Sequence, residues 1–151
     1  MISKKSKYAL KALEALGEKP NSAEQPLLIA EIAKEKQIPR KFLETILLDL
    51  KNHGVLRSKM GKGGGYYLAR AAEKITLGEV VRILEGPLAP LPCLSRMAYK
   101  KCEGCMDETH CGIRLVFKDV HEATLKILDM TSLQDMIDKS RAGQAVCMYH
   151  I

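Results

Sequence analysis

The sequence predicts a mainly α-helical fold that carries one small β-hairpin. Two observations predict it. Apolar residues recur every three or four positions over several segments, which is typical of helices with one buried face. A glycine-rich stretch also separates two short runs of strand-forming residues, which indicates a hairpin. The 151 residues are enough to bury a core without disulfide bonds.

The first part of the chain predicts three helices, over residues 3–17, 27–36 and 39–53. Pro39 suits a first helical turn and disfavours helix just before it, and Gly54 is placed to end the third helix. The apolar positions predicted to be buried are Tyr8, Ala9, Ala12, Leu13 and Leu16, then Leu28, Ile29, Ile32 and Ala33, then Phe42, Leu43, Ile46, Leu47 and Leu50. Two short helices, a tight turn and a third helix with polar residues near its start form a helix-turn-helix pattern.

A cationic hairpin follows that pattern. Residues 55–59 and 66–69 are predicted strands, and the tip between them reads Met-Gly-Lys-Gly-Gly-Gly. Glycines let a backbone approach phosphates closely, although the same residues could simply make a flexible turn. The tip lacks the Gly-Lys-Ser/Thr ending and following helix of a nucleotide-binding loop. We interpret residues 1–86 as a winged helix-turn-helix DNA-binding domain.

Two further signals complete that domain. Thr76 and Glu79 have the spacing of a capping box, which predicts a fourth helix through about Leu84, and Gly86 with Pro87 ends it. Residues 87–110 show no helical or strand periodicity and contain several prolines. A loop of this length is usually functional or disordered.

Residues 111–151 are predicted to form a dimerisation helix and a C-terminal tail. The helix is expected from about residue 111 to 129, and its apolar residues cover more than one face. One face is therefore expected to pack on a second subunit, the alternative being a helix folded back on its own domain. A shorter helix is predicted to begin near Thr131 and end near Lys139. The sequence does not place the tail, and it assigns no role to Cys147.

Charge is distributed unevenly. Residues 1–84 carry 16 Lys and Arg against 9 Asp and Glu, whereas residues 85–151 carry 8 against 9. A basic part beside a near-neutral part favours binding to a polyanion. No run of about 18 apolar residues suggests a membrane span, and the N-terminal residues lack the apolar stretch of a signal peptide, so a cytoplasmic protein is expected.

Four of the five cysteines lie in the loop 87–110 and at its end, together with one histidine. Thiolates suit zinc or an iron–sulfur cluster, and in the cytoplasm such a group is more often metal-binding or redox-active than a structural disulfide framework. Three alternatives remain: an iron–sulfur sensor, a structural zinc site, and a metal-free thiol switch. A dithiol oxidoreductase would need a strand before Cys102 and a helix start there, so an enzyme is not expected.

Several motifs resemble one family across nearly the whole chain. They are Ser6-Lys-Tyr-Ala-Leu10, Phe42-Leu-Glu44, Gly61-x-Gly-Gly-Gly-Tyr66, Leu77-Gly-Glu-Val-Val81 and Leu84-Glu-Gly-Pro87. The family is the bacterial Rrf2 winged-helix transcription regulators of the IscR, NsrR and CymR type. The resemblance implies a cytoplasmic homodimer that binds an inverted-repeat operator on double-stranded DNA. Many members carry a 2Fe–2S or 4Fe–4S cluster on three loop cysteines, and others have lost these cysteines.

The resemblance implies metal ligands at Cys93, Cys105 and Cys111, with Cys102 or His110 as a further ligand. Arg114 stands where some members have a ligating histidine. Lys7 or Tyr8 stands where others have an acidic ligand from the first helix of the partner. In the wing, Met60 replaces an arginine that often precedes the first glycine, so groove reading by the planar guanidinium fork is absent there.

The residues expected to bind DNA come from the first helix, the third helix and the wing. Lys41 and Lys62 are expected to neutralise phosphates, while Glu44 and Arg40 are expected to read bases and the Thr45 methyl to touch thymine. The full set is Lys7, Pro39, Arg40, Lys41, Glu44, Thr45, Arg57, Lys59, Lys62, Gly63, Gly64 and Tyr66.

Overall fold

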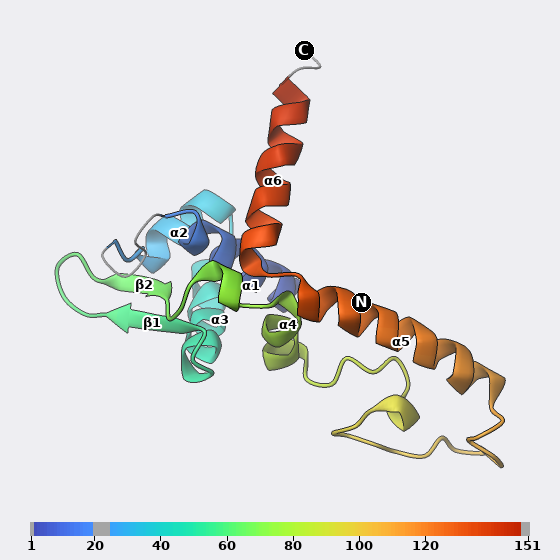
Figure 1. Ribbon diagram of the computed structural model, residues 1–151. Helices are drawn as coiled ribbons and strands as arrows, with labels where there is room; N and C mark the ends of the chain where they lie inside the picture. The colour runs from blue at the N-terminus through green and yellow to red at the C-terminus, as the bar shows by residue number, and fades with distance from the viewer. Residues whose placement is uncertain (1, 20–24, 149–151) are drawn as a thin grey trace.

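A computed structural model describes residues 2–19 and 25–148 of the chain. It is mainly helical with one two-stranded sheet, as the sequence predicts (Figure 1). The elements in order are α1 (Lys4–Gly17), α2 (Ile29–Lys36), α3 (Arg40–Asn52), β1 (Leu56–Lys59), β2 (Gly65–Leu68), η1 (Ala72–Lys74), α4 (Leu77–Glu85), η2 (Pro92–Leu94), α5 (Gly112–Met130) and α6 (Leu133–Met148).

Helix α1 lies at the centre of the domain and contacts α2, α3, α4, α6 and β2. Its small residues Ala9 and Ala12 are fully buried, so neighbouring helices can approach closely. Helix α3 supplies the largest apolar share of the core, with Leu43, Ile46, Leu47 and Leu50 all fully buried. The helix ends as predicted at Gly54, whose φ is +74°. The amide of the next residue, Val55, donates to the Leu50 carbonyl at 2.9 Å.

Two apolar positions differ from the predicted buried faces. Leu28 is 50 % exposed, because it is the N-cap of α2 and its side chain lies outside the helix stripe. Phe42 is 39 % exposed and meets the ring of Tyr8 edge-on, with 5.8 Å between ring centroids. Phe42 therefore covers the edge of the core rather than filling it.

The wing hairpin is antiparallel, and Leu56 pairs with Leu68 at its base. A second pairing fixes it to the domain. Tyr66 donates to the Leu27 carbonyl at 2.8 Å and accepts from the Leu27 amide at 2.9 Å. A Cβ at Gly65 would stand 2.3 Å from the Leu27 carbonyl oxygen, so only glycine allows this approach.

The predicted capping box of α4 forms only in half. The Thr76 hydroxyl accepts from the Glu79 amide at 3.2 Å, as expected. The Glu79 carboxylate does not return to the Thr76 amide and pairs instead with the guanidinium of Arg70. Arg70 follows the wing, so this ion pair joins the hairpin to α4.

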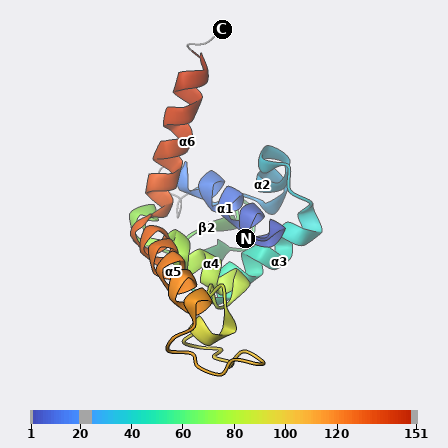
Figure 2. The same ribbon diagram turned by 90° about the vertical axis from the view of Figure 1, so that its right-hand side faces the viewer.

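Helices α5 and α6 leave the domain in different directions (Figures 1 and 2). The prediction that the last helix ends near Lys139 is wrong, because α6 continues to Met148. Its start is fixed in the core by the fully buried Leu133 and Ile137. The later turns lack an apolar stripe but are made of ordinary helix formers, and the single Gly143 costs only about 1 kcal/mol. Most of the tail lies outside the described side chains, including Cys147.

Among the residues that the structure describes, no helix is both long and apolar enough to span a membrane.

Candidate functional site

The outward face of α3 carries the polar residues that the sequence selected. Arg40, Lys41, Glu44 and Thr45 are all exposed, and Pro39 is the exposed N-cap before them. Arg40 Nε donates to Glu44 Oε1 at 3.2 Å, one helical turn away. The helix therefore presents a donor and an acceptor side by side, together with a free lysine.

Leu48 extends this face and was missed in the sequence. It is 50 % exposed, one turn beyond Glu44 and Thr45. A signal was present, because Leu48 falls outside the stripe that predicts the buried face of the helix. An exposed leucine here offers an apolar contact for a thymine methyl group.

The wing presents its cations outward. Arg57, Lys59 and Lys62 are exposed, and so is Gly63. Gly64 is buried instead, and its amide donates to the Gly61 carbonyl at 3.0 Å, so its backbone shapes the tip. Tyr66 is half-buried against the core, with its backbone paired to Leu27.

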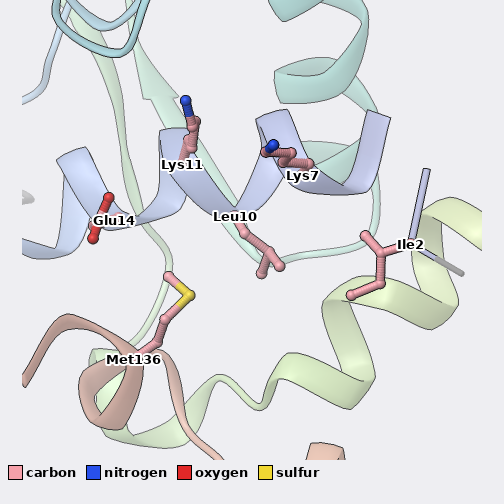
Figure 3. A pocket seen from close by; sticks show the side chains of 6 residues that line it. All are labelled: Ile2, Lys7, Leu10, Lys11, Glu14 and Met136. Atoms are coloured by element: carbon pink, nitrogen blue, oxygen red, sulfur yellow. The ribbon is translucent and has the colours of Figure 1, made fainter. Parts of the chain in front are cut away.

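Lys7 lies apart from that set. It lines an open hollow of about 360 Å³ between α1 and α6 (Figure 3). Leu10 and Ile2 line the same hollow, and Met136 of α6 closes it from the other side. In the described residues, the Lys7 side chain makes no hydrogen bond or ion pair with α3.

The cysteine loop lies at the opposite end of the molecule from the wing, beside the start of α5 (Figure 1). Cys93 is in η2 and is buried, whereas Cys102 is exposed. Cys105 is half-buried, and a turn brings its amide to the Cys102 carbonyl at 3.2 Å. Gly104 permits this turn with a φ of +72°. Cys111 is half-buried at the N-cap of α5.

The four thiols influence one another. The pKa of the Cys102 thiol is raised, first by a side-chain hydrogen bond with Cys93, then by burial and by the nearby thiols of Cys93, Cys105 and Cys111. In the described ranges, no three His, Cys, Asp or Glu side chains stand close enough to share a metal ion. Thiols grouped on one loop are a donor set that suits an iron–sulfur cluster or zinc.

His110 points elsewhere. Its Nδ1 lies 2.5 Å from Asp107 Oδ2, and its ring is 85 % exposed. That contact is the main reason why the pKa of the Asp107 carboxyl is lowered. The arrangement brings Cys102 toward the other thiols and leaves His110 on the surface.

The two ends of the loop adjoin helices α4 and α5. At its end, Arg114 stands in the first turn of α5, and its buried Nε has no hydrogen-bond partner in the described part of the chain. At its start, Glu85 Oε1 accepts from the Ser3 amide at 2.8 Å. Ser3 is the N-cap of α1, so the last residue of α4, just before the loop, is bound to the start of the central helix of the domain.

Helix α5 exposes an apolar seam. No residue of α5 is buried, and six of its exposed apolar side chains repeat with the a and d spacing of a heptad, while Leu115 and Phe117 are exposed off this seam. The a positions are Ile113, Val120 and Ile127, and the d positions are Val116, Ala123 and Met130. The half-buried residues Arg114, His121, Leu125 and Leu128 lie on a separate face, and the helix contacts α4 and η2.

Comparisons with known proteins agree on one family. The family model of Rrf2, described as an iron-dependent transcriptional regulator, matches residues 2–139. A putative helix-turn-helix transcriptional regulator, rrf2-like, from Rhodobacter capsulatus is 48 % identical over 91 % of this chain and 92 % of its own.

Two solved structures have a similar fold. CymR of B. subtilis, titled its global cysteine regulator, aligns with a TM-score of 0.76 and 29 % identity over 92 % of this chain and 97 % of its own. IscR of T. potens aligns with a TM-score of 0.73 and 25 % identity over 95 % and 90 %.

Proposed function

Because the chain belongs to the Rrf2 family of transcriptional regulators, we propose that it is a homodimeric, sequence-specific DNA-binding regulator whose promoter binding depends on an iron–sulfur cluster held by the cysteine loop. The observation that carries the DNA-binding part is the exposed polar face of α3 beside a cationic wing. The four neighbouring thiols at the start of α5 support the sensing part.

We assign base reading to the start of α3 and phosphate contacts to the lysines. Arg40 can donate to guanine, Glu44 can accept from a cytosine amino group, and the Thr45 methyl can touch thymine. Lys41 and Lys62 would each neutralise a phosphate without reading sequence. Gly64, which is buried, would shape the tip of the wing, and the paired backbone of Tyr66 would hold the wing in place beside the DNA.

The seam of α5 supports the homodimer. Three a-position residues that are 50–66 % exposed would lose this exposure in a two-helix coiled coil. Two-fold symmetry makes such an interface self-complementary, so a single seam is sufficient. A two-fold dimer would bind an inverted repeat whose half-sites lie about one helical turn, or a multiple of it, apart.

The ligands of the proposed cluster are Cys93, Cys105 and Cys111, with Cys102 as the nearest further thiol. When bound, the cluster supplies iron–thiolate bonds that tie these three positions together. Cys111 caps α5, so holding its sulfur fixes the first turn of the proposed dimer helix. Glu85, bound to Ser3, gives the other end of the loop a connection to α1.

The second candidate keeps the same DNA-binding regulator but places structural zinc, or no metal, on the loop. The nearness of the Cys93 and Cys102 thiols favours it, because two close thiols can form a disulfide. A dithiol oxidoreductase has less support, because Cys102 and Cys105 sit in a turn without a strand before them.

One purification tests the cluster. We expect protein purified without oxygen to be brown, to contain iron and sulfide, and to lose its visible absorbance in Cys105→Ala. Cys147→Ala is the control, because Cys147 is outside the loop. A colourless protein with one zinc per chain would contradict the sensor and favour the structural site. A metal-free protein that also fails reconstitution with iron and sulfide would leave only the thiol switch.

A further inference from the structure

We propose that Met60, at the tip of the wing, is an apolar contact to the minor groove of DNA that makes binding depend on how easily one base step unstacks. The inference rests on the proposed DNA binding and adds a specificity-determining residue to it. The residue type at Met60 is explained neither by a positive charge, nor by a need for glycine, nor by packing in the core.

Met60 is 93 % exposed, although it follows directly on a strand whose first residue is fully buried. Its neighbours on either side are cationic or glycine, namely Lys59, Gly61 and Lys62. An unbranched apolar side chain gains nothing from water at this position. It gains free energy only when another surface covers it.

The backbone that carries Met60 is already folded into a fixed shape. Gly64 closes the tip by donating to the Gly61 carbonyl, and a Cβ at Gly64 would stand 2.3 Å from the Lys59 carbonyl oxygen. Gly65 packs as closely on the Leu27 carbonyl, which anchors the base of the tip to the segment before α2. A preformed tip loses little backbone entropy on binding. The free energy gained from contacts of the Met60 side chain therefore contributes almost fully to affinity.

The charges around Met60 indicate what covers it. Lys59 and Lys62 flank it and are exposed, which suits the two phosphate rows that border a groove. With both lysines at the phosphates, the side chain between them points at the groove floor. Methionine is among the apolar residues that minor-groove proteins insert at base steps, where they partly unstack the pair of bases. Pyrimidine–purine steps unstack most easily, so the wing would favour them.

An apolar contact and a cationic contact differ in one measurable property. Neutralising a phosphate releases a counterion, so each cation contributes about one to the slope of log affinity against log salt. Burying Met60 releases no counterion. Its loss should lower affinity at every salt concentration by the same factor.

The test uses the full-length protein and a 30-base-pair duplex that the wild type selects from a randomised library. We expect Met60→Ala to weaken binding about tenfold with an unchanged salt slope. Lys62→Ala should lower the slope by about one, and Met60→Arg should raise it by about one. Met97→Ala is the matched control, because Met97 is 92 % exposed but lies in the cysteine loop.

A second measurement isolates the base step. A footprint locates the wing, and the pyrimidine–purine step beneath it is replaced by a stiff A-tract step. The wild type should lose affinity on the stiff duplex, while Met60→Ala should bind both duplexes equally. Equal affinity of Met60→Ala and wild type, or an equal loss on both duplexes, would overturn the inference and leave DNA binding intact. Failure of the wild type to select any duplex would overturn the proposed function as well.

Discussion

Arg40 and Glu44 hold each other on the outward face of α3, with Arg40 Nε 3.2 Å from Glu44 Oε1. Their side chains are 66 % and 46 % exposed, so water screens the pair. An exposed pair one helical turn apart contributes only about 0.3–0.5 kcal/mol. It can therefore open without much cost when either residue finds a base edge. In the free protein it holds both side chains in one rotamer family on the surface that would face the groove.

Glu44→Ala should relax sequence preference more than it weakens non-specific binding. Removing the carboxylate deletes an acceptor for a cytosine amino group, and an incorrect base pair then costs less than the usual ~1–3 kcal/mol. The measurement is affinity for a selected operator and for each single-base variant of it. Glu44→Gln is the control, since its amide oxygen keeps an acceptor but carries no charge.

Another outcome would give Glu44 a structural role. If Glu44→Ala lowered the free energy of unfolding by more than about 1 kcal/mol, or weakened binding to all sequences equally, the contact with Arg40 would matter more than base reading.

Lys41→Ala should lower the salt slope of DNA binding by about one while leaving base preference unchanged. Lys41 is exposed on α3, and a single ammonium neutralises a single phosphate. Affinity is measured on one duplex at several salt concentrations. Lys139→Ala is the control, because Lys139 is exposed on α6, away from α3. An equal slope change in both variants would point to general charge rather than a contact at Lys41.

Gly65→Ala should damage the wing much more than Gly61→Ala. Both residues have positive φ, +146° and +92°, so both substitutions strain the backbone by about 1–3 kcal/mol. Only at Gly65 would the new Cβ also collide with backbone, 2.3 Å from the Leu27 carbonyl oxygen. The difference in free energy of unfolding between the two variants measures that collision. Similar values would mean that the segment around Leu27 moves aside easily.

Local patterns in the sequence were sufficient for the elements and insufficient for contacts between them. The stripe of α3 and the glycine at its end are local signals, so the helix was predicted within one residue. The partner of Glu79 was not predictable, because Arg70 reaches it only after the chain has folded. The full length of α6 was missed because its later turns show no apolar stripe in the sequence.

In the candidate site, too, local sequence signals identified residues but not their positions relative to one another. Residue type and spacing identified the loop cysteines, but irregular backbone has no period from which Sγ positions follow. The nearness of Cys102 to Cys93 therefore came only from the structure. The exposure of Met60 also needed coordinates, because an apolar residue type alone predicts burial.

Glu85→Gln should remove part of the stability that the protein gains between acidic and neutral pH. The pKa of Glu85 is lowered below its ordinary 4.5, first by a side-chain hydrogen bond with Ser3 and further by the Ser3 amide, which donates to the Glu85 carboxylate at 2.8 Å. A group with a lowered folded-state pKa adds stability above its unfolded pKa, and this is lost as pH falls through the folded value. Wild type and variant should therefore differ at pH 7 and converge as the pH falls through the lowered pKa of Glu85.

The measurement for Glu85 is the free energy of unfolding in urea at a series of pH values. Glu73→Gln serves as the control, because Glu73 is an exposed acid in η1. If the difference in free energy of unfolding between wild type and Glu85→Gln stayed constant with pH, the charge of Glu85 would not be its cause. The different geometry of the glutamine amide would then explain the loss of stability.

Val120→Asp should dissociate the proposed dimer. Val120 is a central a position of the α5 seam and is 50 % exposed in the single chain. In a coiled coil it would face its own copy, so two unpaired carboxylates would be buried together at a cost of several kcal/mol. We expect the dimer dissociation constant to rise at least about 100-fold, measured by sedimentation. Affinity for an inverted repeat should fall toward that for one half-site, because the two reading heads are then no longer joined.

Glu122→Asp is the matched control for Val120→Asp, since it places an aspartate two residues along α5 but off the seam. It tests whether aspartate weakens the helix itself, and it should leave the dimer intact. Helix content by circular dichroism separates loss of helix from loss of association. A wild type that sediments as a monomer, or a Val120→Asp variant that remains a dimer, would exclude the seam as the interface. The apolar a and d residues of α5 would then need a different partner.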